Sequence, residues 1–125
     1  DWPMATALSG QSLTNDGDEA PDSICPKGWR LPSKEGNKSY QNLLINSYNT
    51  PTNSDAALLA MPLSFIRTGD YYSGGGYFSN QDGILWSSTV YGSGNTYCLG
   101  FDVSDVNPQL NGYWGGGASV RCVAR

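Results

Sequence analysis

Apolar side chains follow a helical period in one part of this chain, residues 39–48. They recur there at intervals of three and four residues, as Tyr40, Leu43, Leu44 and Tyr48. Side chains at this spacing lie on one face of a helix, so the pattern predicts an amphipathic helix. A second, shorter helix is predicted over residues 55–60, capped by Asn53 or Ser54 and ended by Pro62.

Beyond residue 62 the helical period disappears, and short apolar runs alternate with turn residues. Strands are predicted over residues 63–72, 84–89, 97–103 and 118–124. The turns between them include the glycines at 74–76 and the pair Asn107-Pro108. Two helices followed by an antiparallel sheet predict an α+β fold, and 125 residues fit a single domain over 1–125.

The charge pattern argues against nucleic-acid and membrane-surface partners. The net charge is −4, and no run of Lys or Arg could follow a phosphate backbone or an anionic lipid surface. No apolar stretch approaches the roughly 20 residues of a spanning helix. We therefore expect no membrane insertion of this segment, and any export signal or anchor to lie outside it.

The pairing of the three cysteines indicates whether the protein is extracellular or cytosolic. Cys25 and Cys122 lie in the two motifs that bracket the chain, Cys25-Pro26-Lys27-Gly28-Trp29-Arg30-Leu31-Pro32 and Ser119-Val120-Arg121-Cys122-Val123. A disulfide between them would close the domain end to end and indicates a secreted or cell-surface protein. A bridge between Cys98 and Cys122, or three free thiols in a cytosolic protein, are the alternatives. The chain has no His, which leaves a zinc site short of a ligand, so no metal or other cofactor is predicted.

The alternation within residues 97–103 predicts which way Cys98 points. Tyr97, Leu99, Phe101 and Val103 share one face of the strand, and Leu99 and Phe101 are expected to face the core. Cys98 lies on the other face and is therefore expected to point outward.

These motifs resemble a known family. Together with Trp86-Ser87-Ser88-Thr89 and the spacing Tyr97-x-Leu99-x-Phe101, they are similar to the Fibrobacter succinogenes major paralogous domain across the whole chain. That family is a bacterial cell-surface module with a C-type-lectin-like fold. The resemblance implies two helices, a small twisted antiparallel sheet and long loops that carry recognition.

The resemblance does not imply calcium-dependent sugar binding. In lectins of that kind a Glu-Pro-Asn type triplet and a Trp-Asn-Asp triplet supply hard oxygen ligands. Here Asn107-Pro108-Gln109 lacks the carboxylate, and no Trp-Asn-Asp occurs. A calcium-dependent sugar site is therefore not expected.

Some proteins of this fold class are targets of diversity-generating retroelements, which rewrite adenines and so vary Asn- and Tyr-type codons. Such codons never yield Lys, Glu, Gln, Met or Trp. Residues 68–120 contain no Lys, Glu or Met, and the residues of the excluded set that occur there are Gln81, Trp86, Gln109 and Trp114. The pattern predicts a displayed, variable surface within residues 70–114. Cys98 would then be one of the residues that a varied Asn- or Tyr-type codon can yield. The ligand-binding candidates are Tyr91, Ser93, Asn95, Cys98, Asp102, Ser104, Asp105, Asn107, Asn111, Tyr113 and Trp114.

The tryptophans and Arg121 have structural alternatives to a binding role. Trp29 and Trp86 are expected in the core, whereas Trp114, beside a Gly triplet, is the preferred ligand anchor. Arg121 is expected to pair with Asp102 or Asp105.

The resulting hypothesis is an extracellular binding module that recognises a protein or a glycan and performs no catalysis. A structural or tip subunit of a surface appendage, whose loops make assembly contacts, is the alternative. An enzyme of the formylglycine-generating type would need a pair of reactive cysteines, and Cys98 and Cys122 are the candidate pair in this sequence.

Overall fold

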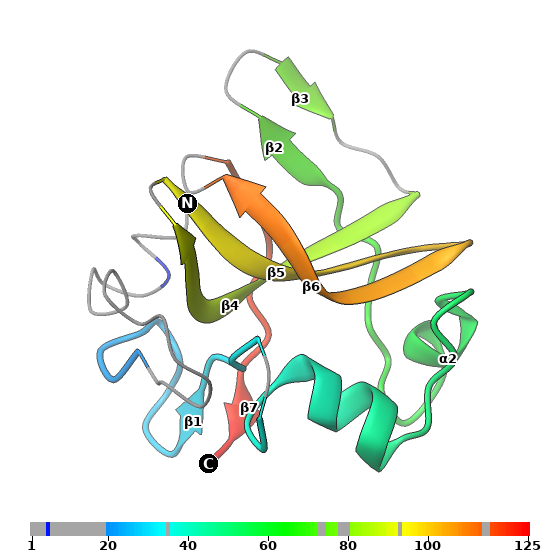
Figure 1. The fold of residues 1–125 in the computed structure, drawn as a ribbon, viewed down its shortest axis with the longest axis horizontal. Coiled ribbons are helices and arrows are strands. Elements are labelled where there is room, and N and C mark those ends of the chain that lie inside the picture. The colour runs from blue at the N-terminus through cyan, green and yellow to red at the C-terminus, as the bar shows by residue number, and fades with distance from the viewer. Residues whose placement is uncertain are drawn as a thin grey trace.

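A twisted antiparallel sheet of three strands, ordered β4-β5-β6, lies at the centre of the fold (Figure 1). The computed structural model describes residues 5, 20–34, 36–72, 75–77, 81–92, 94–113 and 116–125. Its elements are β1 (Trp29–Arg30), η1 (Asn42–Ser47), α2 (Ala56–Leu59), β2 (Asp70–Tyr72), β3 (Gly75–Tyr77), β4 (Asp82–Gly92), β5 (Asn95–Asp102), β6 (Asp105–Tyr113) and β7 (Val123–Ala124).

Two smaller antiparallel pairs flank the central sheet. The β2–β3 hairpin projects from one side, and β1 pairs with β7 near the C-terminus of the chain (Figure 1). Short helices together with antiparallel strands confirm the predicted α+β class.

Both predicted helices form. The first is a π-helix over most of its length, in which Tyr48 N donates to Leu43 O at 3.2 Å. Its Leu44 is fully buried, as the apolar spacing predicted. The second helix begins one residue later than predicted, because Asp55 rather than Asn53 or Ser54 occupies the N-cap.

The side chain of Asp55 does not cap the helix. Instead its two carboxylate oxygens accept from Arg67 Nε at 2.7 Å and Arg67 Nη2 at 2.8 Å. Its main-chain N–H donates to Asp102 O at 3.1 Å. Asp55 therefore fastens the start of α2 both to the segment that follows the helix and to the end of β5.

The strand predictions are confirmed in the centre and wrong at the edges. Residues 84–89 and 97–103 fall largely within β4 and β5, but only 70–72 of the predicted strand 63–72 and 123–124 of the predicted strand 118–124 are strands. The predicted turn at Asn107-Pro108 is also wrong, because both residues lie inside β6. The register shifts there, since Cys98 pairs with Leu110 and Gly100 with Asn107. An edge strand with a bulge tolerates the proline.

The central sheet is covered on both faces. On one face, Leu99 and Phe101 join the helix residues Tyr40, Leu44 and Leu58 in one buried cluster. On the other face, Trp86, Val90 and Cys98 pack with Ala5, Ala118 and Val120. No helix in the part of the chain described here combines the length and apolarity needed to cross a bilayer.

Candidate functional site

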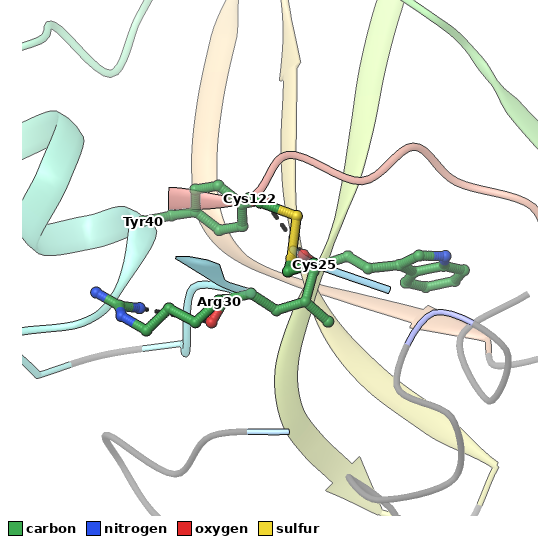
Figure 2. The surroundings of a disulfide bond; sticks show 6 residues. Cys25, Arg30, Tyr40 and Cys122 are labelled. Atoms are coloured by element: carbon green, nitrogen blue, oxygen red, sulfur yellow. Dashed lines mark hydrogen bonds between the residues drawn. A yellow bond between two sulfur atoms is a disulfide. The ribbon is translucent and has the colours of Figure 1, made fainter. Parts of the chain in front are cut away.

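The disulfide predicted between the two bracketing motifs is present. Cys25 and Cys122 are bonded with an S–S distance of 2.04 Å across a separation of 97 residues. Figure 2 shows the bond with Arg30 and Tyr40 around it. The bond confirms the predicted pairing and leaves Cys98 as the free cysteine among the described residues.

The prediction that Trp29 is buried is wrong, whereas Trp86 is buried as expected. Trp29 is 47% exposed, and its neighbour Arg30 is the buried residue of β1. Arg30 Nη1 donates to Lys38 O at 2.6 Å. Because side chains alternate along a strand, the inward position taken by Arg30 leaves Trp29 at the surface.

Arg121 makes contacts other than the predicted ion pair with Asp102 or Asp105. Its Nη1 donates to Ser64 O at 3.3 Å, and its guanidinium lies 4.2 Å from the centre of the Phe65 ring. Asp102 instead accepts from the N–H and the hydroxyl of Ser104, and these bonds hold the pKa of Asp102 below its usual value.

The prediction that Cys98 points outward is also wrong. Its side chain is fully buried against Trp86 and Val90, because the face opposite Leu99 is itself covered. Burial raises the pKa of the Cys98 thiol to about 12, so the thiol is neutral at physiological pH. A buried, protonated thiol cannot contact a ligand at the surface.

Cys98 also limits which residue can stand at position 112 of β6, the register partner of Thr96 and so diagonal to Cys98. A Cβ added at Gly112 would lie 2.5 Å from Cys98 Sγ. We therefore expect Gly112→Ala to lower the free energy of unfolding by about 1–3 kcal/mol, the usual cost of overpacking. Cys98→Ala in the same chain removes the Sγ atom and should recover part of that loss. Urea unfolding of both single variants and the double variant measures the coupling, and strictly additive losses would contradict the contact.

The remaining candidates fall into two groups at opposite ends of the central sheet. Asp102, Ser104 and Asp105 lie at the turn between β5 and β6, whereas Asn95 begins β5. The eight residues of β5 span about 25 Å at the usual rise of a strand. One compact ligand site therefore cannot include both groups.

The group at the start of β5 shares one face of the sheet. Tyr97 lies on the Leu99 face, and Asn111 is its register partner on β6. Asn95 is two residues before Tyr97 and so projects to the same side. Tyr91 is on this side too, because Val90 packs in the opposite cluster with Trp86. We call Tyr91, Asn95, Tyr97 and Asn111 the tyrosine–asparagine face.

Two aromatic rings and a lysine organise this face. The rings of Tyr91 and Tyr97 meet edge to face with centroids 5.2 Å apart, and Lys34 Nζ lies 4.9 Å from the Tyr97 centroid. Lys34 is held at the rim by its main chain, whose N–H donates to Thr89 Oγ1 at 3.1 Å and whose carbonyl accepts from Gln109 Nε2 at 3.4 Å. Tyr91 is 54% exposed, and Asn111 is exposed as well.

Two residues of this surface were missed in the sequence. Tyr97 was assigned only to the apolar side of its strand, although its period-two relation to Asn95 was visible. Lys34 is remote in sequence and carried no signal. Of the other candidates, Ser93 and Trp114 lie outside the described residues, and for Tyr113 the structure describes only its main-chain pairing with Asn95. Asn107 Oδ1 accepts from Gln109 N at 3.0 Å.

Across the described ranges, no group of three or more His, Cys, Asp or Glu side chains is arranged to hold a metal ion. Comparison of the chain with protein-family models, with curated proteins and with solved structures finds no match.

Proposed function

We propose that this protein is an extracellular recognition module with a C-type-lectin-like fold, related to the Fibrobacter succinogenes major paralogous domain, and that it binds a protein or glycan through the tyrosine–asparagine face. The observation that carries the proposal is the meeting of Tyr91, Asn95 and Asn111, nominated from sequence, with Tyr97 on one stretch of the sheet, where Tyr91 and Asn111 are exposed. The Cys25–Cys122 disulfide supports an oxidising, extracellular setting.

The chemistry of the face suits recognition. Tyrosine supplies rigid, amphipathic contact area at a low cost in side-chain entropy, and asparagine adapts its hydrogen bonds to different partners. The Lys34 ammonium over Tyr97 adds a positive charge to the rim. The covered half of the same sheet face, around Leu99 and Phe101, acts as the rigid support.

The binding proposal predicts which substitutions abolish binding. The labelled protein is applied to arrays of glycans and of bacterial and host surface proteins, and the strongest ligand is then titrated against variants. Tyr91→Ala and Tyr97→Ala should each weaken binding at least tenfold, because truncating a buried aromatic anchor costs about 2 kcal/mol or more. Asp105→Ala, at the opposite end of the sheet, is the matched control and should leave the affinity unchanged.

Two results would contradict this assignment. One is binding that survives both tyrosine substitutions, and the other is binding that is lost in Asp105→Ala. Thermal melts of each variant separate loss of the face from loss of the fold, since exposed Tyr91 lies outside both buried clusters.

We propose further that the face is diversified by a retroelement. The locus sequenced from many isolates should then differ at Tyr91, Asn95 and Asn111, while Leu85, Leu99 and Phe101 stay constant. The three constant positions are buried in one cluster, where a change of side-chain volume is costly. Differences scattered evenly over both sets would refute diversification and leave the binding proposal standing.

A further inference from the structure

A narrow slot lies beside the outer edge of β4, between residues 64–68 and residues 119–121. Its volume is about 200 Å³, and none of its lining residues belongs to the tyrosine–asparagine face. Small-molecule sites usually have roughly 300–1,000 Å³, so this slot suits one side chain of a larger partner better than a free ligand. The lining includes buried Leu85, half-buried Val120 and Ile66, which is 72% exposed.

Hydrogen bonds tie the two segments together at the ends of the slot. At one end Ser119 Oγ donates to Thr68 Oγ1 at 2.8 Å, and at the other Arg121 Nη1 donates to Ser64 O at 3.3 Å. Main-chain bonds hold the 119 segment against β4, with Trp86 N donating to Ser119 O at 3.0 Å. The slot is therefore formed by segments already fixed in place.

Arg121 supplies the charge at the slot. Its guanidinium is stacked 4.2 Å from the Phe65 ring centre, and Phe65 is itself 4% exposed and packed in the core. An Arg side chain has five N–H donors in a planar fork that matches a carboxylate. The bond to Ser64 engages one nitrogen, and the contact with the Phe65 ring holds the guanidinium beside the slot, so its further donors are available to an acidic group.

The main chain of residues 66–68 adds a third recognition element. Within the described residues, the N–H of Phe65 bonds to Leu58 O and that of Gly69 to Asp82 O. Between them, Ile66 and Thr68 make no main-chain hydrogen bond in the described structure. Although this segment is not a strand, its main-chain groups can bond to an extended peptide.

We propose that this slot binds an extended peptide segment of a partner protein in which one residue separates an aliphatic residue from an acidic one, so that both side chains project to the same side. The aliphatic side chain occupies the slot between Ile66 and Val120, the carboxylate pairs with Arg121, and the peptide main chain bonds to that of residues 66–68. Charge complementarity selects this occupant, because Arg121 is the one charged side chain among the described residues that line the slot. The proposal is independent of the tyrosine–asparagine face.

The test uses the full chain and a defined probe. The blocked peptide Thr-Val-Thr-Asp-Thr is titrated into isotope-labelled protein and followed by amide chemical shifts, with Thr-Val-Thr-Asn-Thr as the matched peptide. We expect saturable shifts at Ile66, Thr68 and Arg121 Nε, and an affinity about tenfold weaker for the Asn peptide, as expected when a charge-assisted bond is lost.

Variants locate the interaction. Arg121→Gln should weaken binding of the Asp peptide about tenfold, and Arg121→Lys, which keeps the charge but not the planar fork, should also weaken it. Arg125→Gln removes an exposed guanidinium elsewhere and serves as the control. The lysine variant keeps the proposal testable if the glutamine variant melts early.

Several outcomes would overturn the proposal. One is an absence of shifts up to about millimolar peptide, the weak limit of specific recognition. Another is a set of shifts confined to residues outside the slot. Equal binding of the Asp and Asn peptides, or the same shifts from sodium acetate alone, would also overturn it. The last would show a carboxylate site that does not read a peptide.

Discussion

Replacing both Cys25 and Cys122 with serine should lower the free energy of unfolding by about 4–5 kcal/mol. The two cysteines are 97 residues apart in sequence. In the chain-entropy model, closing a loop of that length lowers the entropy of the unfolded chain and so stabilises the folded state by about 4–5 kcal/mol. Small domains have total stabilities of about 5–15 kcal/mol, so this loss is a large share of the whole.

The local structure has little to replace the bond. Cys25 precedes β1 and Cys122 precedes β7, and these two strands pair through only Trp29↔Ala124 and Arg30↔Val123. One further main-chain bond joins Arg125 N to Gly28 O at 2.9 Å. Without the disulfide, this short ladder must hold two distant parts of the chain together.

Urea unfolding of the double variant and the parent measures the loss, and Cys98→Ala is the control for removing a sulfur that is not bonded. Mass spectrometry after alkylation without reduction checks the starting state. Native protein should gain no adduct because Cys98 is buried, and urea-unfolded protein should gain one. A stability change below about 1 kcal/mol would contradict the role assigned to the bond, given the typical range for disulfides.

The second large effect is a loss of stability at alkaline pH, of about 2 kcal/mol by pH 10.5 from Cys98 alone. Burial raises the pKa of this thiol from 9.0 to about 12 in the folded protein. The unfolded state therefore loses the proton first. The stabilisation is fully present below pH 9 and is lost progressively as the pH rises toward 12, at about 1.4 kcal/mol for each pH unit.

Tyr40 adds to the same transition. Its hydroxyl is fully buried and donates to Trp86 O at 3.2 Å. Burial, and secondarily the nearby Cys98, raise the pKa of Tyr40 above its ordinary value of 10.0, although Arg121 opposes this. The sign is the same as for Cys98, since the folded state holds the neutral form, and this contribution is lost above pH 10.

Urea titrations at several pH values between 7 and 10.5 measure the slope. Cys98→Ala should show a smaller decline with pH than the parent, and it also prevents thiolate attack on the disulfide in the unfolded state. Tyr40→Phe should reduce the decline further while lowering stability at pH 7 through loss of the bond to Trp86. Parallel pH profiles for Cys98→Ala and the parent would refute the assignment.

The tyrosine–asparagine face could be predicted in part. Tyr91, Asn95 and Asn111 were nominated from codon type, and the structure brings these three together. The same criterion nominated Asp102 and Asp105, which lie at the far end of β5. Residue type does not reveal distance along a sheet, and the bulge at Pro108, which sets the register of Asn111 against Tyr97, gave no signal beyond a proline that suggested a turn.

By itself the sequence determined the α+β class, the positions of both helices, the central strands β4 and β5, though not β6, and the Cys25–Cys122 bond. Each depends on local periodicity, turn residues or the pairing of motifs along the chain. The tertiary structure alone decided that Cys98 is buried, that Trp29 is exposed and that Arg121 stacks on Phe65. Those outcomes depend on what covers the second face of the sheet and on which strand lies beside which. Alternation within one strand divides its side chains between two faces but does not reveal which face is covered.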